Sequence, residues 1–485
     1  MSLDSPPPPT PPAGPQVGAD EWVAREGHRR EYLPSWLGTA QRQAERIGWW
    51  PRLAAAGLAA AALPLVGLGG FQLQVGIDAL IVALLAVGLN IVVGWTGLLD
   101  LGYVAFFGCG AYGFALVSSG QVGPNGIHLP SYLSIPLVML ATAGIGLLVG
   151  LPSRRLVGDY LAIVTLFFGE AFVEFTNNVA PATLGGPNGI VGIDPISVFG
   201  HQITTNTGYY LLLVVVLVLT MAVLRLLEFS RTGRAWRAVR EDPLAAGSMT
   251  IPVDRVKLLA FAFGAAVAAL AGTIFAAQQI SVFPTDFDTP YLILIYAGLV
   301  LGGAGSIAGA ATGALVVMVI YDGLLRSPTY SGYLFYGLIL LTLLVKLRPW
   351  RRLALVLAAT AALGFAVHPI AAAISPRAVA GSLGSTGWIG SALHDWVIVP
   401  ANATAIGNWG FVALVCLLIA LVQVGPRVRT ILLPPTLYLA AFVWETRLSA
   451  EPAVTRQLMI GAILIVMMNA RPQGLLGQRR VEAIT

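Results

Sequence analysis

Polar side chains inside long apolar segments are the first residues in this sequence that suggest a chemical role. Asp100 follows Gly97, which interrupts one apolar segment, and Glu170 and Glu174 lie four residues apart inside another, on one helical face. Ionisable groups are costly within a lipid bilayer, so those that occur there usually face a cavity or a polar partner. Such groups bind and pass a polar solute without making covalent bonds. They therefore indicate a solute path rather than a catalytic centre.

The candidate solute path combines these polar residues with a second interruption, near Gly302–Gly305. It comprises Thr96, Asp100, Tyr103, Tyr160, Thr165, Glu170, Gly302 and Gly303. The polar members also have a purely structural interpretation, which the sequence leaves open. Glu170 would then pair with a neighbouring helix, Thr165 would bond to its own backbone, and Asp159 would cap a helix N-terminus.

A second group of candidate residues lies in the charged stretch 228–261, EFSRTGRAWRAVREDPLAAGSMTIPVDRVKLLAF. Its pattern predicts a short helix over 232–242 that ends at Pro243, with Trp236 offering an apolar contact among charged neighbours. A short amphipathic helix of this kind suits the docking of a soluble motor protein onto a membrane subunit. The alternative is a helix that rests on anionic lipid. The candidate docking residues are Arg234, Trp236, Arg237, Arg240, Glu241 and Asp242.

The segments around both groups are long and apolar. Of the 485 residues, 56% are hydrophobic and only 11% are charged, and the mean hydropathy is +0.79. Soluble domains carry about 25% charged residues. Because a spanning helix needs about 20 apolar residues, we predict an all-α fold, a polytopic membrane helix bundle of about thirteen segments. The candidate spans are 53–70, 72–94, 98–119, 131–152, 159–178, 207–228, 258–281, 291–325, 331–347, 353–375, 407–425, 429–446 and 455–470.

The positions of the basic residues predict how these spans are oriented. Loops rich in Arg and Lys stay in the cytoplasm. The loops expected inside carry Arg154 and Arg155, the run Arg225 to Lys257, the run Lys346 to Arg352, Arg427 and Arg429, and the tail Arg471 to Arg480. The loops expected outside, which contain one Arg between them, are 120–130, 179–206 and 376–406. When the broken segment 291–325 is counted as two half-helices, we therefore expect a multi-pass protein of the bacterial inner membrane with both termini in the cytoplasm.

The sequence contains no recognisable site for catalysis, nucleotide or metal. A phosphate-binding loop needs a Lys after a Gly-rich turn, and neither Lys257 nor Lys346 has that context. The cysteines, Cys109 and Cys416, are far apart, and the five histidines lack metal-ligand spacing. We predict a chain that is no enzyme and binds no cofactor itself, so that any ATP, with its Mg, is bound and hydrolysed on partner subunits.

Two stretches suggest a weak internal duplication. LNIVVGWTGLLDLGYVAFFGCGAYGFAL and ILIYAGLVLGGAGSIAGAATGAL each place a Gly-rich break between two apolar half-segments. Transporter sites are often built at such breaks, in equivalent places of two halves. The alternative is coincidence, because Gly-rich breaks are common in membrane helices.

Six phrases in a fixed order carry a resemblance to a known family. They are GWTGLLDLGYVAFFGCGAYGFAL, GDYLAIVTLFFGEAFVEFTNN, GGPNGI, GRAWRAVREDPLAAGSMTIPVDRVKLLAF, VLGGAGSIAGAATGAL and the closing RPQGLLG. Together they resemble the permease subunits of bacterial branched-chain amino-acid ABC importers, the LivH/LivM family, and its LivM side in particular. The resemblance covers roughly 75–325 and 455–477. It implies a complex of two related permeases, two ABC ATPase subunits and an extracytoplasmic substrate-binding protein, in which 231–243 is the coupling helix.

The resemblance also divides the chain. Residues 1–50 are expected to be a disordered Pro-rich and basic cytoplasmic segment, and 51–340 the permease core with the coupling loop 228–257. Residues 341–454 are additional membrane segments without a match in the family, and 455–485 hold the last span and a cytoplasmic tail. We expect the region of roughly 350–450 to be peripheral to the solute path.

The expected solutes are branched-chain or other hydrophobic amino acids. A first alternative is a urea or short-amide permease of the same architecture. A second alternative is an ion-coupled secondary transporter or channel, in which Asp100 and Glu170 would be the ion-coupling sites.

Overall fold

The computed structural model describes most of the chain. It covers residues 48–67, 69–120, 127–154, 158–179, 181–198, 200–326, 328–347, 350–381, 390–391, 393–448, 452–470 and 474–476. The Pro-rich segment and most of the basic tail predicted from the sequence lie outside these residues. Two compact units are distinguished, 1–60 with 479–485, and 61–478. The description below concerns the second unit and, of the first, only its part of helix α3.

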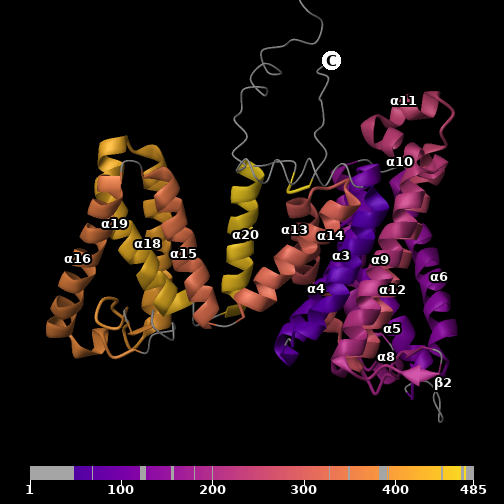
Figure 1. Ribbon diagram of the computed structural model, residues 1–485, viewed down its shortest axis with the longest axis horizontal. Helices are drawn as coiled ribbons and strands as arrows, with labels where there is room; N and C mark the ends of the chain where they lie inside the picture. The colour runs from indigo at the N-terminus through magenta and orange to yellow at the C-terminus, as the bar shows by residue number, and fades with distance from the viewer. Residues whose placement is uncertain are drawn as a thin grey trace, which may run out of the picture. The chain divides into compact units, whose positions relative to one another are not determined.

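Helices dominate the described chain (Figure 1). Helix α3 (Trp49–Ala62) lies mostly in the first unit. The core helices of the second unit are α4 (Gly70–Leu89), α5 (Tyr103–Val117), α6 (Ser131–Gly150), α7 (Asp159–Asn178), α8 (Pro181–Leu184), α9 (Asn206–Phe229), α10 (Arg231–Glu241), α11 (Pro243–Ser248), α12 (Val253–Gln279), α13 (Thr289–Gly302) and α14 (Ile307–Met318). They are followed by α15 (Pro328–Lys346), α16 (Trp350–Ile374), α18 (Ala403–Gln423), α19 (Pro426–Val443) and α20 (Pro452–Ala470). Three π-helical turns, η2 (Asn90–Trp95), η6 (Val319–Leu324) and η8 (Trp444–Leu448), continue α4, α14 and α19.

The helices confirm the prediction of a multi-pass, all-α membrane protein. Each of the expected spans overlaps a helix of the structure. Six described segments are long and apolar enough to cross a bilayer: Gly70–Trp95, Ser131–Ser153, Asn206–Phe229, Val253–Gln279, Ile307–Leu324 and Trp350–Ile374. Shorter apolar helices account for other expected spans, such as 98–119, whose helix begins only at Tyr103. Residues 98–102, which the sequence pattern assigned to the span 98–119, form a loop before this helix.

Helix α4 lies at the centre of the core. Most of its residues are buried, from Leu73 to Leu89, and it packs against α9, α12, α13 and α14. A helix that is apolar on every side is stable only when other helices surround it. The remaining elements are therefore arranged around α4, and the π-helical turn at its end is held inside the protein.

Small residues let helices α13 and α14 approach closely. Each carries a Gly-x-x-x-Gly pair, Gly298 with Gly302 and Gly309 with Gly313. A Cβ atom added to Gly302 would lie 1.9 Å from the carbonyl oxygen of Gly309. No side chain fits in that space, and such pairs are a known means of close helix packing in membranes. The close approach keeps α13, before the break, packed against α14, after it.

Three short antiparallel strand pairs lie at the end of the core opposite α10 and α11 (Figure 1). They are β1 (Ser118–Ser119) with β2 (Ile127–His128), β3 (Ile190–Val191) with β6 (Ser281–Val282), and β4 (Ser197–Val198) with β5 (His201–Gln202). Nδ1 of His128 and Oδ2 of Asp194 add a side-chain contact of 2.5 Å between two loops. The strand pairs and this contact involve the loops 120–130 and 179–206, which the sequence predicts to be extracytoplasmic, and β3 is also joined to β6 after the end of α12.

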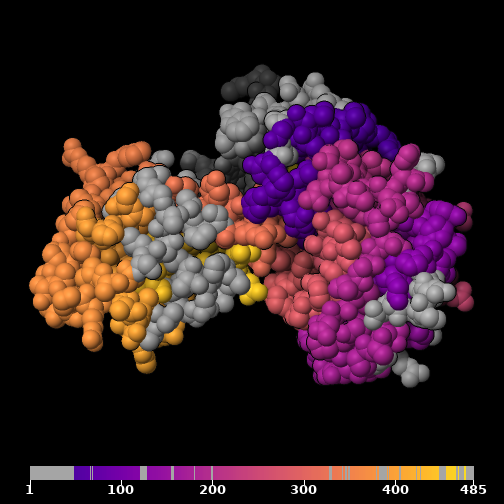
Figure 2. All heavy atoms as spheres, turned by 90° about the horizontal axis from the view of Figure 1, so that it is seen from below, coloured from indigo at the N-terminus to yellow at the C-terminus, as the bar shows by residue number. Residues whose placement is uncertain are grey.

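The added helices form a small core together with residues of α15. Val397, Val399 and Ala441 are buried together, and the ring of Phe335 stacks on Trp444 with the centroids 4.2 Å apart. Figure 2 shows the orange side chains of this region gathered together. The region thus packs as structured helices, as the apolar pattern of 353–446 predicts.

Candidate functional site

Two interruptions of the helical core meet each other. One follows η2, where the chain runs through residues 97–102 before α5 begins, and the other is Gly303–Ser306 between α13 and α14. The backbone N–H of Gly305 donates to Oδ1 of Asn90 over 2.7 Å. The indole Nε1 of Trp95 donates to the carbonyl oxygen of Gly305 over 3.3 Å. We call this meeting point the junction; it contains both stretches in which the sequence suggested a duplication.

The π-helical turn η2 explains why Asn90 and Trp95 reach the second break. A π-helical turn widens the helix locally, and such turns are frequent at functional sites. Both side chains are almost fully buried, so they pair with backbone groups that would otherwise be unsatisfied. Irregular backbone at membrane depth persists only where the protein covers it. The two breaks therefore stabilise each other.

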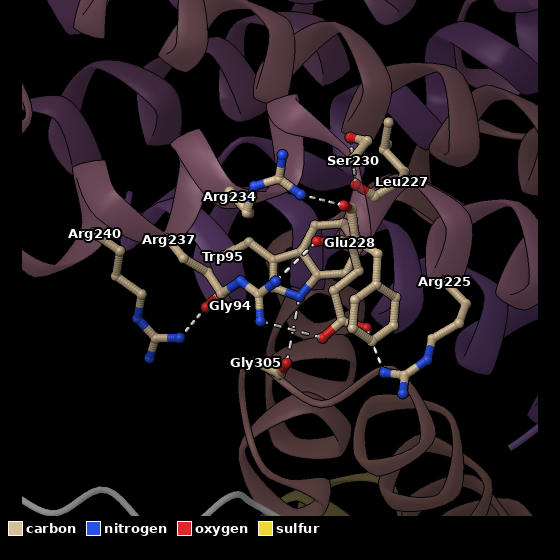
Figure 3. A network of polar contacts seen from close by, with 11 residues as sticks. Gly94, Trp95, Arg225, Leu227, Glu228, Ser230, Arg234, Arg237, Arg240 and Gly305 are labelled. Atoms are coloured by element: carbon tan, nitrogen blue, oxygen red, sulfur yellow. Dashed lines mark hydrogen bonds and ion pairs between the residues drawn. The ribbon is translucent and has the colours of Figure 1, made fainter. Parts of the chain in front are cut away.

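Helix α10 contacts the junction through Arg240. Its guanidinium Nη1 donates to the carbonyl oxygen of Gly94 (Figure 3). The same nitrogen lies 3.0 Å from where a Cβ atom of Gly305 would be, and the Cγ atom of Arg240 lies 3.0 Å from the equivalent position on Gly97. One cationic side chain from the charged loop thus contacts both breaks of the membrane core.

Trp236 also points into the core, which corrects its predicted role. Its exposed fraction is 0%. The indole Nε1 donates to the carbonyl oxygen of Val256 over 2.8 Å, and the ring stacks on Trp95 with centroids 5.7 Å apart. The prediction that Trp236 offers its ring to a partner protein is wrong, because that face of α10 packs against η2 and α12.

Two further arginines of α10 are directed back toward the end of α9. Nη2 of Arg237 donates to the carbonyl oxygen of Glu228 over 2.8 Å, and Nη1 of Arg234 donates to that of Phe229 over 2.6 Å. The Glu228 carboxylate, which is 7% exposed, also pairs with Arg225 at 2.7 Å. These contacts, drawn in Figure 3, fix the orientation of α10 relative to α9.

Pro243 begins a second short helix as well as following the first. Asp242 is the N-cap of α11, and its Oδ1 accepts hydrogen bonds from the backbone N–H groups of Leu244 and Ala245. Proline is favoured at the first helical position because its missing N–H would have no partner there. The side chains of Leu244 and Met249 are 86% and 76% exposed.

Leu244 and Met249 therefore give this loop an exposed apolar surface at α11, whose start was not predicted from the sequence. The signal was present in the order Asp-Pro-Leu, since an N-cap residue followed by proline marks a helix start. Glu241 and Asp242 are exposed beside it. We call Glu241, Asp242, Leu244 and Met249 the exposed loop surface.

Four of the predicted path residues lie around residues 96–103 and satisfy backbone groups there. Thr165 Oγ1 accepts from the N–H of Leu101 over 2.9 Å. Thr96 Oγ1 donates to the carbonyl oxygen of Val92, and the hydroxyl of Tyr103 donates to that of Gly264 over 3.2 Å. Asp100 is completely buried, and its Oδ1 accepts from the N–H of Gly102. Gly302 and Gly303 are buried at the other break.

Two buried polar atoms at the junction have no hydrogen-bond partner among the described residues. They are Oδ2 of Asp100 and Nδ2 of Asn90. Buried polar atoms are nearly always paired, and exceptions often mark sites that work with water, an ion or a solute. The junction therefore has one buried acceptor, Oδ2 of Asp100, and one buried donor, Nδ2 of Asn90, that remain available to a water, an ion or a solute.

Tyr160 and Glu170 lie apart from the junction, on the outer face of α7. Tyr160 is 70% exposed, and the carboxylate of Glu170 accepts from the hydroxyl of Thr289 over 2.5 Å. Burial, together with the nearby carboxylate of Glu170, raises the pKa of Asp288. This acidic face of a membrane helix needs a polar neighbour or water, so it forms a second candidate region, separate from the first.

Comparisons with known proteins give consistent results. Residues 73–344 match a family described as the permease component of branched-chain amino acid transport systems. The permease protein LivM of the high-affinity branched-chain amino acid transport system from Salmonella typhimurium is 36% identical over 288 residues, which cover 55% of this chain and 66% of that protein. LivM from Escherichia coli matches equally. The E. coli permease LivH of that system is 28% identical over 284 residues, which cover 54% of this chain and 88% of LivH. No solved structure matches.

Proposed function

Since this chain belongs to the permease family of branched-chain amino acid transport systems, we propose that it is the membrane-spanning subunit of an ATP-binding-cassette importer. Its solutes are branched-chain or other hydrophobic amino acids, delivered by an extracytoplasmic binding protein. The matched part spans 66% of the length of the LivM relatives. The proposed partners are a second, homologous permease and two ATPase subunits, which bind ATP and Mg.

The contact between Arg240 and the junction carries this proposal. Ser230 caps α10 by accepting from the N–H of Gly233, Arg234 and Arg237 hold its start against α9, and Trp236 packs beside Trp95. A force that a partner applies to α10 therefore reaches Gly94 and Gly305 through a rigid helix and the partly buried side chain of Arg240. This is the arrangement that a motor needs to open or close a path at two broken helices.

The exposed loop surface is the proposed ATPase contact. Leu244 and Met249 supply an exposed apolar contact, and Glu241 and Asp242 supply negative charge beside it. Apolar anchors surrounded by polar residues are typical of protein interfaces. A lipid surface is less compatible, since anionic lipid attracts basic residues rather than these two carboxylates.

The orientation predicted from the basic loops agrees with this arrangement. Helices α10 and α11 then face the cytoplasm, where ATPase subunits reside, and the paired strands lie outside, where a binding protein docks. The protein is accordingly proposed to reside in the inner membrane with both termini in the cytoplasm. The relatives support amino acids over urea or amides, since their names specify branched-chain amino acid transport.

Reconstitution of the complete complex tests the proposal. The complex in liposomes, with the binding protein outside and ATP inside, is expected to accumulate labelled leucine, and urea is the control solute. A complex with an ATPase subunit inactivated in its phosphate-binding loop should not accumulate leucine. Uptake driven by a proton or sodium gradient in vesicles that contain only this chain would contradict the proposal and support the ion-coupled alternative.

A further inference from the structure

A short segment after α20 closes the end of α13. The backbone N–H of Leu475 donates to the carbonyl oxygen of Leu301 over 2.8 Å, and that of Leu476 donates to Gly302 over 3.0 Å. These carbonyls belong to the last turn of α13, where a helix leaves its acceptors without partners. The segment Gly474–Leu476 thus supplies the hydrogen bonds that the interrupted helix lacks at its break.

Gly474 makes this approach possible. Its φ of +78° lies in the left-handed region, which favours glycine. A Cβ atom added to it would lie 2.6 Å from both the Cα and the N atom of Gly303. Backbone atoms cannot move aside as a flexible side chain can. Any larger residue at position 474 must therefore separate the segment from the break or distort the break.

The opposite end of α20 is held by an ion pair. Nη1 of Arg456 lies 3.5 Å from Oδ1 of Asp322 in η6, and their side chains are only 19% and 14% exposed. The guanidinium also lies over the ring of Tyr321, 5.5 Å from its centroid. Charges within a membrane protein are tolerated when they are paired in this way. The pair fixes α20 to the turn that follows α14.

Between these two ends, α20 packs along the broken helix. Ile460 is buried with Leu294, Leu301 and Val317, which come from both α13 and α14. Helix α20 and the segment after it therefore make three sets of contacts with α13, α14 and η6. These are the ion pair of Arg456 with Asp322, the apolar cluster around Ile460, and the hydrogen bonds of Gly474–Leu476. The contacted residues all lie within the part that matches the family, whereas the added helices α16, α18 and α19 lie between α15 and α20 in the sequence.

We infer that α20 and Gly474–Leu476 form a strap that positions the α13–α14 break for contact with Arg240. The inference rests on the proposed function and extends it to α20 and the segment that follows it. The junction receives Gly305 from this break, so the position of Gly305 depends on how α13 ends. The strap binds Leu301 and Gly302, the last two residues before the break. The strap therefore determines where the break lies relative to α10.

The strap also accounts for the insertion of additional helices. Both of its attachment points are on the family core, so helices added between α15 and α20 do not need to change the junction. Gly474–Leu476 are therefore positioning residues for the coupling step, although they lie about 170 residues from Gly303 in sequence.

A substitution at Gly474 tests the inference in the assembled, reconstituted complex. Gly474→Val should retain co-purification of the partner subunits and basal ATP hydrolysis, and should lower the solute-stimulated part of the hydrolysis about tenfold, because two backbone hydrogen bonds at the break are lost. Gly461→Ala is the matched control, since a Cβ atom at Gly461 meets no atom within 4 Å, and it should behave like the wild type. Normal stimulated hydrolysis in Gly474→Val would overturn the inference.

A charge reversal at the other end keeps the test valid if Gly474→Val prevents assembly. Arg456→Asp should lower stimulated hydrolysis, and the double variant Asp322→Arg with Arg456→Asp should restore at least half of it. A double variant that is no better than the single one would overturn the role of the ion pair in the strap. If ATP hydrolysis by the wild-type complex is not stimulated by solute, the proposed function fails. If the wild-type complex is stimulated and the variants are stimulated equally, only the strap fails.

Discussion

Replacing Trp236 by alanine should destabilise this subunit itself rather than detach a partner. The side chain is completely buried, and burying a tryptophan removes on the order of 150–250 Å² from water. At about 25 cal/mol per Å² this corresponds to roughly 4–6 kcal/mol, which agrees with the ~3–5 kcal/mol measured for Trp→Ala substitutions in protein cores. The hydrogen bond to Val256 and the stacking on Trp95 are lost in addition.

Leu244→Ala is the matched comparison for Trp236→Ala. Leu244 is 86% exposed, so its truncation should change the stability of the isolated subunit by less than about 0.5 kcal/mol. In the complex, however, it should weaken ATPase association by about 1–2 kcal/mol. Trp236→Phe should lie between the two alanine variants in stability, since it keeps a ring to stack on Trp95 and loses the N–H that binds Val256.

Two measurements separate packing from docking. Thermal unfolding of the isolated subunit in detergent should show a lower Tm for Trp236→Ala and an unchanged Tm for Leu244→Ala. Co-purification of the ATPase subunits should decrease for Leu244→Ala. The reasoning is refuted if Trp236→Ala keeps the wild-type Tm and loses the ATPase, because its ring would then face the partner.

Three further predictions concern coupling, topology and the added helices. Arg240→Gln should retain ATPase binding and lose most solute-stimulated hydrolysis, because the charge-assisted bond to Gly94, of about 1.5–3 kcal/mol, links α10 to the junction; normal stimulation would contradict this. In intact cells, a membrane-impermeant thiol reagent should label a cysteine at Thr204 and not one at Ser248, and the reverse labelling would overturn the orientation. Replacing 350–450 by a short linker should leave leucine uptake within about twofold of normal; abolished uptake in an assembled complex would show that the region belongs to the path.

Local patterns were sufficient to predict the long helices of the described chain. An apolar run of about 20 residues has few alternatives to a spanning helix, since every backbone group must be paired within the segment. The break near Gly302–Gly305 and the helix expected over 232–242 were predicted for similar reasons, namely glycine and proline at defined positions. The start of α11 followed the same local rules but was overlooked, the π-helical turns and the short strand pairs were not predicted, and α5 begins at Tyr103 rather than at residue 98.

The candidate site was predicted only in part. Asp100 and Gly302 were recognised as polar or small residues at interruptions, and the structure places them at the two breaks, whereas Thr165 reaches the first break from within α7. Tyr160 and Glu170 belong to the same list, yet they lie on the outer face of α7. A list of residue types cannot separate these cases, because a helical face is defined by its neighbours as much as by its spacing.

The sequence by itself determined the membrane class, the spans, the breaks and the family, since each depends on residues close together in the chain or on ordered phrases. Only the tertiary structure decided that Trp236 faces inward, that Arg240 contacts Gly94, and that Gly474 lies against Gly303. These contacts join residues separated by about 20 to 170 positions. The periodicity of the sequence indicates which face of a helix is apolar. It does not indicate which helix packs against that face, because many helices of this chain are nearly equally hydrophobic and only their packing distinguishes them.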